Sequence, residues 1–195
     1  MIKALLFDCF GVLAGRGFHE TYKMAGGDPI TDHEFIEGLF DRVNLGLMSE
    51  GEFIKAISSK LAISTQEFTR VIKEAERPNK DLFDYIGTLK HRYKTAIVSN
   101  ANVGAMESKF GREALNKYFD VVIVSGEEGH VKPDPKIYLI AAKKLDVNPS
   151  ECVFVDDQEA YCIAAQSLGM HSVLYKEFTQ MKADMESVLG AYGKK

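Results

Sequence analysis

The sequence predicts an α/β protein, in which helices cover both faces of a parallel sheet and a small all-helical segment follows the first strand. The apolar run at 4–7 has the length of a buried strand, and such continuous apolar strands are typical of parallel sheets. After Pro78, short apolar runs alternate with amphipathic stretches, which is the pattern of repeated strand–helix crossovers. Between these two regions, residues 14–78 have helical periodicity and no strand pattern.

The first strand, Ala4–Phe7, ends abruptly at Asp8. Ligands of parallel sheets bind beyond the carboxyl ends of the strands, which makes Asp8 a candidate site residue. Gly11 permits a tight turn and a close approach of the backbone to a small ligand. Taken alone, however, this segment fits an Asp that opens a turn or caps a helix at least as well.

The segment from 14 to 78 is expected to form four helices, the first of which ends before the turn signal Gly26-Gly27-Asp28-Pro29. The other three should each begin with a capping box, in which a Ser or Thr hydroxyl accepts from the N3 amide and a Glu reaches back. The three patterns are Thr31-Asp32-His33-Glu34, Ser49-Glu50-Gly51-Glu52 and Ser64-Thr65-Gln66-Glu67. We therefore expect residues 1–13 and 79–195 to form the core, and residues 14–78 to form a helical cap.

The rest of the chain predicts four more strands, each bounded by turn residues or helices. They are Thr95–Val98, Val121–Val124, Cys152–Val155 and Ser172–Leu174. Four helices between and after them are expected to bury one apolar face each. These faces are Leu82, Phe83, Ile86 and Leu89; Ile137, Ile140, Ala141 and Leu145; Ala160, Ile163, Ala164 and Leu168; and Phe178, Met181, Met185, Val188 and Leu189.

Composition narrows the class of protein. With 195 residues and a formal net charge of -4, the chain has no excess of basic residues that would favour a nucleic acid or an anionic membrane as partner. No apolar run approaches the roughly 20 residues that cross a bilayer, and the N-terminus lacks the pattern of a signal peptide. The cytoplasm is the default location. Cys9, Cys152 and Cys162 fit neither a metal-ligand nor a disulfide framework.

Polar side chains stand at the ends of three predicted strands: Asp8, Ser99-Asn100 and Asp156-Asp157. Lys132 joins them from a loop that two prolines stiffen. Each residue alone has a simpler explanation as a helix cap or a solvated charge. Together, three carboxylates at one sheet edge repel one another unless a cation lies among them. Carboxylate oxygens suit Mg²⁺, whereas a hydroxyl and an ammonium suit a phosphate group, so the pattern indicates phosphoryl transfer.

These segments resemble the motifs of the haloacid dehalogenase superfamily of hydrolases. The matching stretches are Phe7-Asp8-Cys9-Phe10-Gly11-Val12-Leu13, Ile97-Val98-Ser99-Asn100, residues 129–138 around Lys132, and Val153-Phe154-Val155-Asp156-Asp157.

The resemblance implies a Rossmann-like core and a helical cap inserted after the first strand. It also implies a Mg²⁺-dependent phosphatase that hydrolyses a small phosphorylated metabolite. In that reading Asp8 is the nucleophile, Ser99 and Lys132 are catalytic, and Ser99, Asn100 and Lys132 bind the substrate. Mg²⁺ is held by Asp8, the carbonyl of Phe10, Asp156 and Asp157.

Two positions depart from the family pattern. Phosphatases of the family usually carry an acid two residues after the nucleophile, where this chain has Phe10, and an Asn four residues after the acidic pair, where it has Tyr161. Without the acid, we expect aryl and acyl phosphates to be hydrolysed better than alkyl phosphates. Two alternatives stay open: a metal-independent 2-haloacid dehalogenase, and a phosphate-binding regulatory protein with little turnover. The sequence indicates neither the natural substrate nor the oligomeric state.

Overall fold

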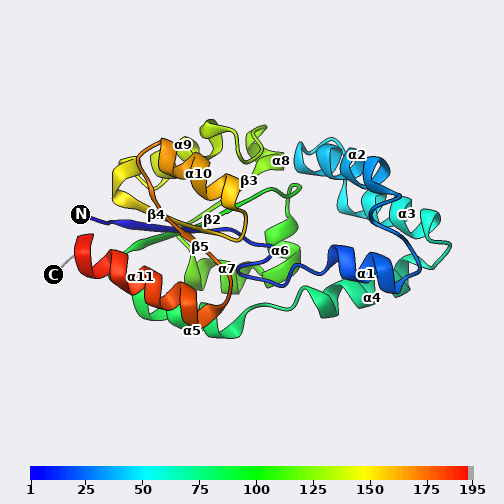
Figure 1. The fold of residues 1–195 in the computed structure, drawn as a ribbon, viewed down its shortest axis with the longest axis horizontal. Helices are drawn as coiled ribbons and strands as arrows, with labels where there is room; N and C mark the ends of the chain where they lie inside the picture. The colour runs from blue at the N-terminus through cyan, green and yellow to red at the C-terminus, as the bar shows by residue number, and fades with distance from the viewer. Residues whose placement is uncertain (193–195) are drawn as a thin grey trace.

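A computed structural model describes residues 1–192, and its core is a sheet of five parallel strands with the order β3-β2-β1-β4-β5 (Figure 1). The strands are β1 Ala4–Phe7, β2 Lys94–Ser99, β3 Val121–Val124, β4 Cys152–Asp156 and β5 His171–Leu174. All five predicted strands are therefore confirmed, and no strand extends more than one residue beyond the prediction at either end. The parallel α/β fold class is confirmed as well.

Helices cover both faces of the sheet because successive residues of a strand point to opposite sides. In β1, Leu5 and Phe7 join one apolar cluster, whereas Ala4 and Leu6 join the other. The first cluster lies against α5 Lys80–Leu89, α7 Arg112–Tyr118 and α11 Phe178–Tyr192. The second lies against α9 Pro135–Lys144 and α10 Glu159–Ser167. Double coverage explains why β1 is apolar at every position.

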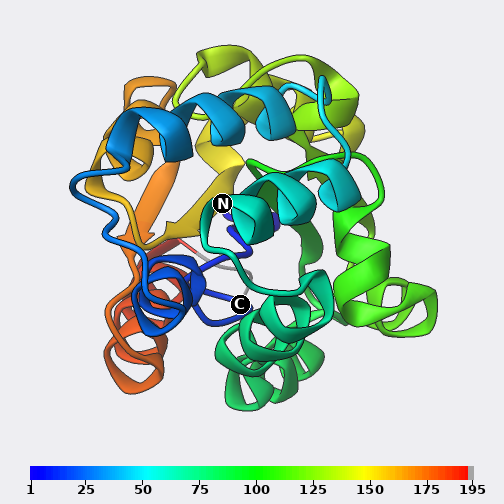
Figure 2. The same cartoon turned by 90° about the vertical axis from the view of Figure 1, so that its right-hand side faces the viewer.

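The segment 14–78 forms α1 Phe18–Met24, α2 His33–Asn44, α3 Glu50–Lys60 and α4 Thr65–Ala75. These helices pack around an apolar cluster of their own, centred on Phe18, Tyr22, Ile57 and Phe68. They lie beyond the carboxyl ends of the strands, and the view from that side has them in front of the sheet (Figures 1 and 2). The two connections to the sheet run side by side, because Gly15 donates its amide to the carbonyl of Arg77 at 3.2 Å.

Of the three predicted capping boxes, one is complete, one is half formed and one is absent. The box at Ser49 and Glu52 is complete. Ser64 accepts from the Glu67 amide, but the Glu67 carboxylate pairs with an arginine one turn later and does not reach back. The box at Thr31 is wrong: α2 begins at His33 after Asp32, with no side-chain cap. Thr31 belongs to the preceding turn, where its hydroxyl donates to Asp28 at 2.6 Å, and Asp32 takes the N-cap position.

Helix α10 buries only part of the predicted face. Ala164 and Leu168 pack against the second cluster as expected, but Ile163 is 57% exposed, and Cys162 and Ala165 are buried instead. The helix is rotated so that Tyr161 packs toward Lys132, with the ammonium 5.0 Å from the ring centroid. The prediction favoured Ile163 because it is the largest apolar residue of this helix. The smaller Cys162 and Ala165 pack against the sheet instead.

Three short helices have no counterpart in the sequence prediction: α6 Ala105–Phe110, α7 and α8 Ser125–Glu128. Each spans two turns or fewer, which is too short for an apolar period to be recognised. A single 3₁₀ turn, η1 Pro149–Glu151, precedes β4. Among residues 1–192, no helix combines the length and the apolar character needed to span a membrane.

Candidate active site

The carboxyl ends of β1, β2 and β4 bring the predicted residues together. Phe7 is in register with Ile97 on one side and with Val155 on the other, so Asp8 emerges beside the last residues of both neighbours. Those last residues are Ser99 and Asp156. Asp8 is anchored by its own amide, which donates to the carbonyl of Val155 at 2.9 Å. Residues far apart in the sequence thus meet because the sheet is parallel.

Lys132 lies at the centre of this group. Its ammonium donates to Asp8 Oδ1 at 2.6 Å and to Asp156 Oδ2 at 2.7 Å, and all three side chains are buried. Asn100 holds the backbone of this residue with two bonds: its Oδ1 accepts from the Lys132 amide and its Nδ2 donates to the Lys132 carbonyl. The Asn100 side chain therefore positions the lysine.

A third carboxylate completes an acidic cluster. Asp8, Asp156 and Asp157 each offer an oxygen within 4.8 Å of the others, a spacing that could hold a metal ion. Asp157 also accepts from Arg16 at 2.9 Å. Gly11 has a φ of +98°, and a Cβ at this position would lie 2.2 Å from Asp157 Oδ2. Glycine is therefore required there for the carboxylate to approach the loop after β1.

Burial and charge work against each other in this cluster. Burial raises the pKa of Asp156 and that of Asp157, because a buried carboxylate loses its hydration, while the charges of Lys132 and Arg16 respectively oppose the rise. Burial lowers the pKa of Lys132, but the negative charges of Asp8 and Asp156 outweigh it and raise that pKa. The ammonium form of Lys132 is thus favoured by its carboxylate partners.

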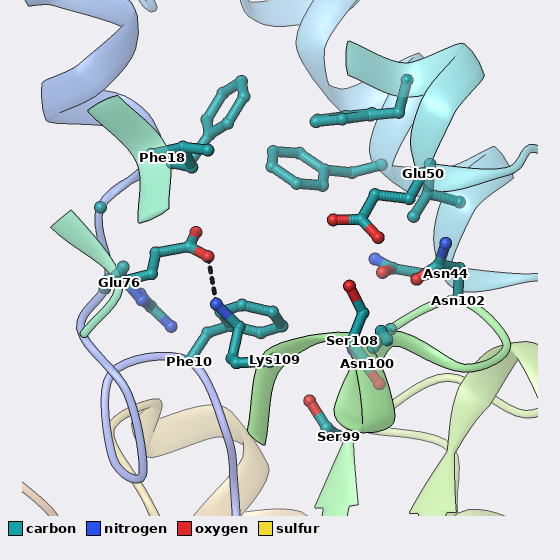
Figure 3. Close-up of a pocket in the computed structure, with 18 of the residues that line it drawn as sticks. Phe10, Phe18, Asn44, Glu50, Glu76, Ser99, Asn100, Asn102, Ser108 and Lys109 are labelled. Carbon is teal, nitrogen blue, oxygen red and sulfur yellow. Dashed lines mark hydrogen bonds and ion pairs between the residues drawn. The ribbon is translucent and has the colours of Figure 1, made fainter. Parts of the chain in front are cut away.

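A cavity of about 810 Å³ opens above these residues. Its floor includes Asp8, Phe10, Ser99, Asn100 and Lys132, and its far wall consists of helices of the segment 14–78. In Figure 3, Ser99 lies deep in this space and Phe18 lies at the opposite end. Ser99 is 1% exposed, and its buried hydroxyl has no hydrogen-bond partner among the described residues. A buried hydroxyl without a partner is costly, which suits a position that a ligand oxygen completes.

Some residues of the cavity are not among the predicted site residues. Arg16 pairs with Asp157 and also lines the cavity. His130, in the loop that carries Lys132, is not among the lining residues and pairs with Asp134 at 2.9 Å. Glu76 and Lys109 line the cavity and pair with each other at 2.6 Å. No local pattern points to that pair, since the partners are far apart in the sequence.

The family model for haloacid dehalogenase-like hydrolases matches residues 2–169, which is most of the chain. The chain belongs to this family. It is therefore a hydrolase whose parallel sheet carries the acidic cluster at the position described above.

Similar proteins of the family include named phosphatases. A phosphorylated carbohydrates phosphatase of Thermotoga maritima is 28% identical over 88% of this chain and 84% of its own length. A D-ribitol-5-phosphate phosphatase of Bacteroides thetaiotaomicron is 27% identical, covering 98% of this chain and 100% of its own. A HAD family enzyme of the same organism, solved in complex with magnesium and inorganic phosphate, superposes with a TM-score of 0.74. It is 25% identical, and the match covers 90% of this chain and 95% of that one.

Proposed function

We propose that this hydrolase is a Mg²⁺-dependent phosphatase that cleaves a small phosphorylated metabolite through an aspartyl-phosphate intermediate. The observation that carries the proposal is the cluster of Asp8, Asp156 and Asp157, two of which bind the Lys132 ammonium, at the floor of the cavity. Anionic nucleophile, cation and carboxylate ligands are the parts that phosphoryl transfer needs. The names of the two phosphatase relatives support a phosphorylated sugar or polyol as the substrate class.

In this mechanism a carboxylate oxygen of Asp8 attacks phosphorus, and the bond from phosphorus to the ester oxygen breaks. Water then cleaves the phosphoryl-aspartate and regenerates the carboxylate. The Ser99 hydroxyl donates to a phosphoryl oxygen and so gains the partner that it lacks. The Lys132 ammonium, which lies 2.6 Å from Asp8 Oδ1, stabilises the negative charge of the same phosphoryl group. Asn100, expected to bind substrate, contributes by fixing the lysine loop and by lining the cavity.

The charges of the site support a divalent metal. Three carboxylates facing Lys132 and Arg16 leave one excess negative charge, and a phosphate dianion adds two more. Mg²⁺ would be held by Asp8, the backbone carbonyl of Phe10, Asp156 and Asp157, all hard oxygen donors. When bound, it would supply the positive charge that lets the phosphate dianion approach a carboxylate nucleophile. The segment 14–78 would act as a cap that keeps bulk water from this centre, as its place over the cavity suggests.

The two alternatives fit the residues less well. A metal-independent dehalogenase has no use for three clustered carboxylates, which Lys132 and Arg16 together neutralise only in part. A regulatory protein without turnover would be favoured by Phe10, which has no proton to give to a leaving group. The buried nucleophile–lysine pair argues for retained chemistry, because burying such charges without a function is costly.

Release of inorganic phosphate from a panel of sugar, polyol and aryl phosphates, with Mg²⁺ and with chelator, tests the proposal. We expect release that requires Mg²⁺ and no release of halide from 2-halo acids. Metal-independent halide release would establish the dehalogenase instead, and inactivity on every ester would favour the regulatory protein.

Mg²⁺ is also expected to stabilise the fold, because it binds the folded protein and not the unfolded chain. At a concentration about 100 times the dissociation constant, this effect amounts to roughly 2.7 kcal/mol. Melting curves in chelator and in millimolar Mg²⁺ measure it. The matched control is Asp156→Asn, which should lose most of the Mg²⁺-dependent shift; an equal shift in both proteins would contradict the assignment of Asp156 as a ligand.

A further inference from the structure

The wall of the cavity contains a second buried ion pair. Lys109, in α6, and Glu76, which directly follows α4, lie 2.6 Å apart, and each side chain is only 15% exposed. The pair therefore links the sheet domain to the end of the helical segment. Figure 3 has both side chains reaching toward each other beside Phe10, on the side of the cavity opposite Asn44 and Asn102.

Lys109 contacts Phe10, one of the two residues at which this chain departs from the usual pattern. Its ammonium is 4.9 Å from the centroid of the Phe10 ring, and both residues line the cavity that contains Asp8 and Ser99. If the phosphoryl group is bound at the floor by Ser99 and Lys132, the rest of the substrate must extend upward between these walls. Phe10 stands at the position where phosphatases of the family usually carry the acid for the leaving group, so an ester oxygen that leaves toward this position would meet Phe10 and Lys109.

The ammonium of Lys109 retains hydrogen-bonding capacity. It has three N–H donors, and Glu76 is the one acceptor that the described residues provide. The π face of the Phe10 ring attracts the ammonium electrostatically without taking up a hydrogen-bond donor. The exposed pair Lys3–Glu151 has the same length of 2.6 Å, but Lys3 is 47% exposed and faces solvent. The Lys109 side chain is instead 15% exposed, and its remaining N–H donors can bond to a ligand in the cavity.

We propose that Lys109 is a further catalytic residue, which donates a hydrogen bond to the ester oxygen as it leaves phosphorus, and that Glu76 is the residue that positions it. This inference rests on the proposed phosphatase function. As the bond from Asp8 to phosphorus forms, the electron pair of the breaking bond moves to the ester oxygen. The ammonium stabilises that developing charge and keeps its own proton, and the released alkoxide takes a proton from water. A cation thus serves where Phe10 cannot.

The test is the dependence of kcat/KM on the leaving group, measured with nitrophenyl, phenyl, trifluoroethyl and ethyl phosphate. Nitrophenolate needs little stabilisation, whereas ethoxide needs much. We expect Lys109→Met to lower kcat/KM about 100-fold for ethyl phosphate, as for other lost hydrogen bonds to a developing oxyanion, and about tenfold or less for nitrophenyl phosphate. Lys109→Arg should restore part of the loss. Glu76→Gln should have a smaller effect in the same direction, because its amide oxygen can still accept from the ammonium.

Lys3→Met, which breaks the exposed pair of equal length, is the matched control and should leave the leaving-group dependence unchanged. Melting temperatures verify that each variant is folded. An equal loss for all four esters in Lys109→Met would overturn the inference and leave a structural role, with the phosphatase function intact. A larger leaving-group effect in Glu76→Gln than in Lys109→Met would assign the role to Glu76 and overturn it too. If the wild-type protein cleaves none of the esters, both the function and the inference are wrong.

Discussion

Replacing Asp8 by Asn is expected to reduce phosphate release to background, a loss of roughly 10⁴-fold or more, as for the loss of other covalent nucleophiles. The neutral amide keeps the shape of the side chain but cannot attack phosphorus. The backbone anchor to Val155 remains, and Lys132 keeps its bond to Asp156 at 2.7 Å, so the variant should fold. Single-turnover phosphate release and a melting curve measure the two halves of this prediction.

The control for Asp8→Asn is Asp184→Asn, the same chemical change at an exposed position of α11. It should retain wild-type activity. A purified and folded Asp8→Asn protein that still turns over would contradict the aspartyl-phosphate mechanism. In that case the carboxylate cluster would have to act only by binding metal and activating water.

The sheet and the floor of the cavity were predictable because each rests on a short-range signal. The four residues of β1 are all apolar, which follows directly from burial on both faces, and its bounds match the prediction. Asp8, Ser99 and Asp156 each stand at the end of such a run, and parallel strands bring their carboxyl ends to one edge. Local pattern plus one topological rule therefore sufficed to bring these residues together.

The walls of the cavity were not predictable in this way. The Lys109–Glu76 pair joins α6 to the residue after α4, and nothing near either residue in the sequence indicates a partner. Likewise, Asp157 pairs with Arg16 across most of the chain. Such contacts depend on how the helical segment sits over the sheet, which is a result of tertiary packing. Side-chain identity alone cannot distinguish a buried pair from a solvated charge.

Similar reasoning explains the errors within elements that were otherwise correct. The stripe predicted for α10 followed the largest apolar residue, Ile163, but the helix is set by Tyr161 over Lys132 and by small residues against the sheet. The Thr31 hydroxyl could cap the following helix or bond within the preceding turn. In the structure it donates to Asp28 in that turn. In both cases a single side-chain contact, Tyr161 with Lys132 or Thr31 with Asp28, accompanies an arrangement that hydrophobic periodicity does not predict.

Lys132→Met is expected to destabilise the metal-free protein strongly, because Lys132 is the buried cation between Asp8 and Asp156. Methionine nearly preserves the length of the side chain but removes the charge, which leaves two buried carboxylates facing each other. Removing one partner of a buried ion pair typically costs about 3 to 5 kcal/mol, whereas the exposed pair broken by Lys3→Met should cost about 1 kcal/mol or less.

Denaturant unfolding of both variants in chelator and in Mg²⁺ measures this difference. Mg²⁺ should restore part of the stability of Lys132→Met, because a divalent ion among the same carboxylates replaces some of the lost charge. Its stabilising effect should then be larger in Lys132→Met than in the wild-type protein, where the ammonium already neutralises part of the cluster. Activity should stay low even with metal, since the charged donor beside the phosphoryl group is lost and only the neutral Ser99 hydroxyl remains. A Lys132→Met protein as stable as Lys3→Met in chelator would mean that the carboxylates tolerate each other without a cation, and would remove the electrostatic argument for a metal at this site.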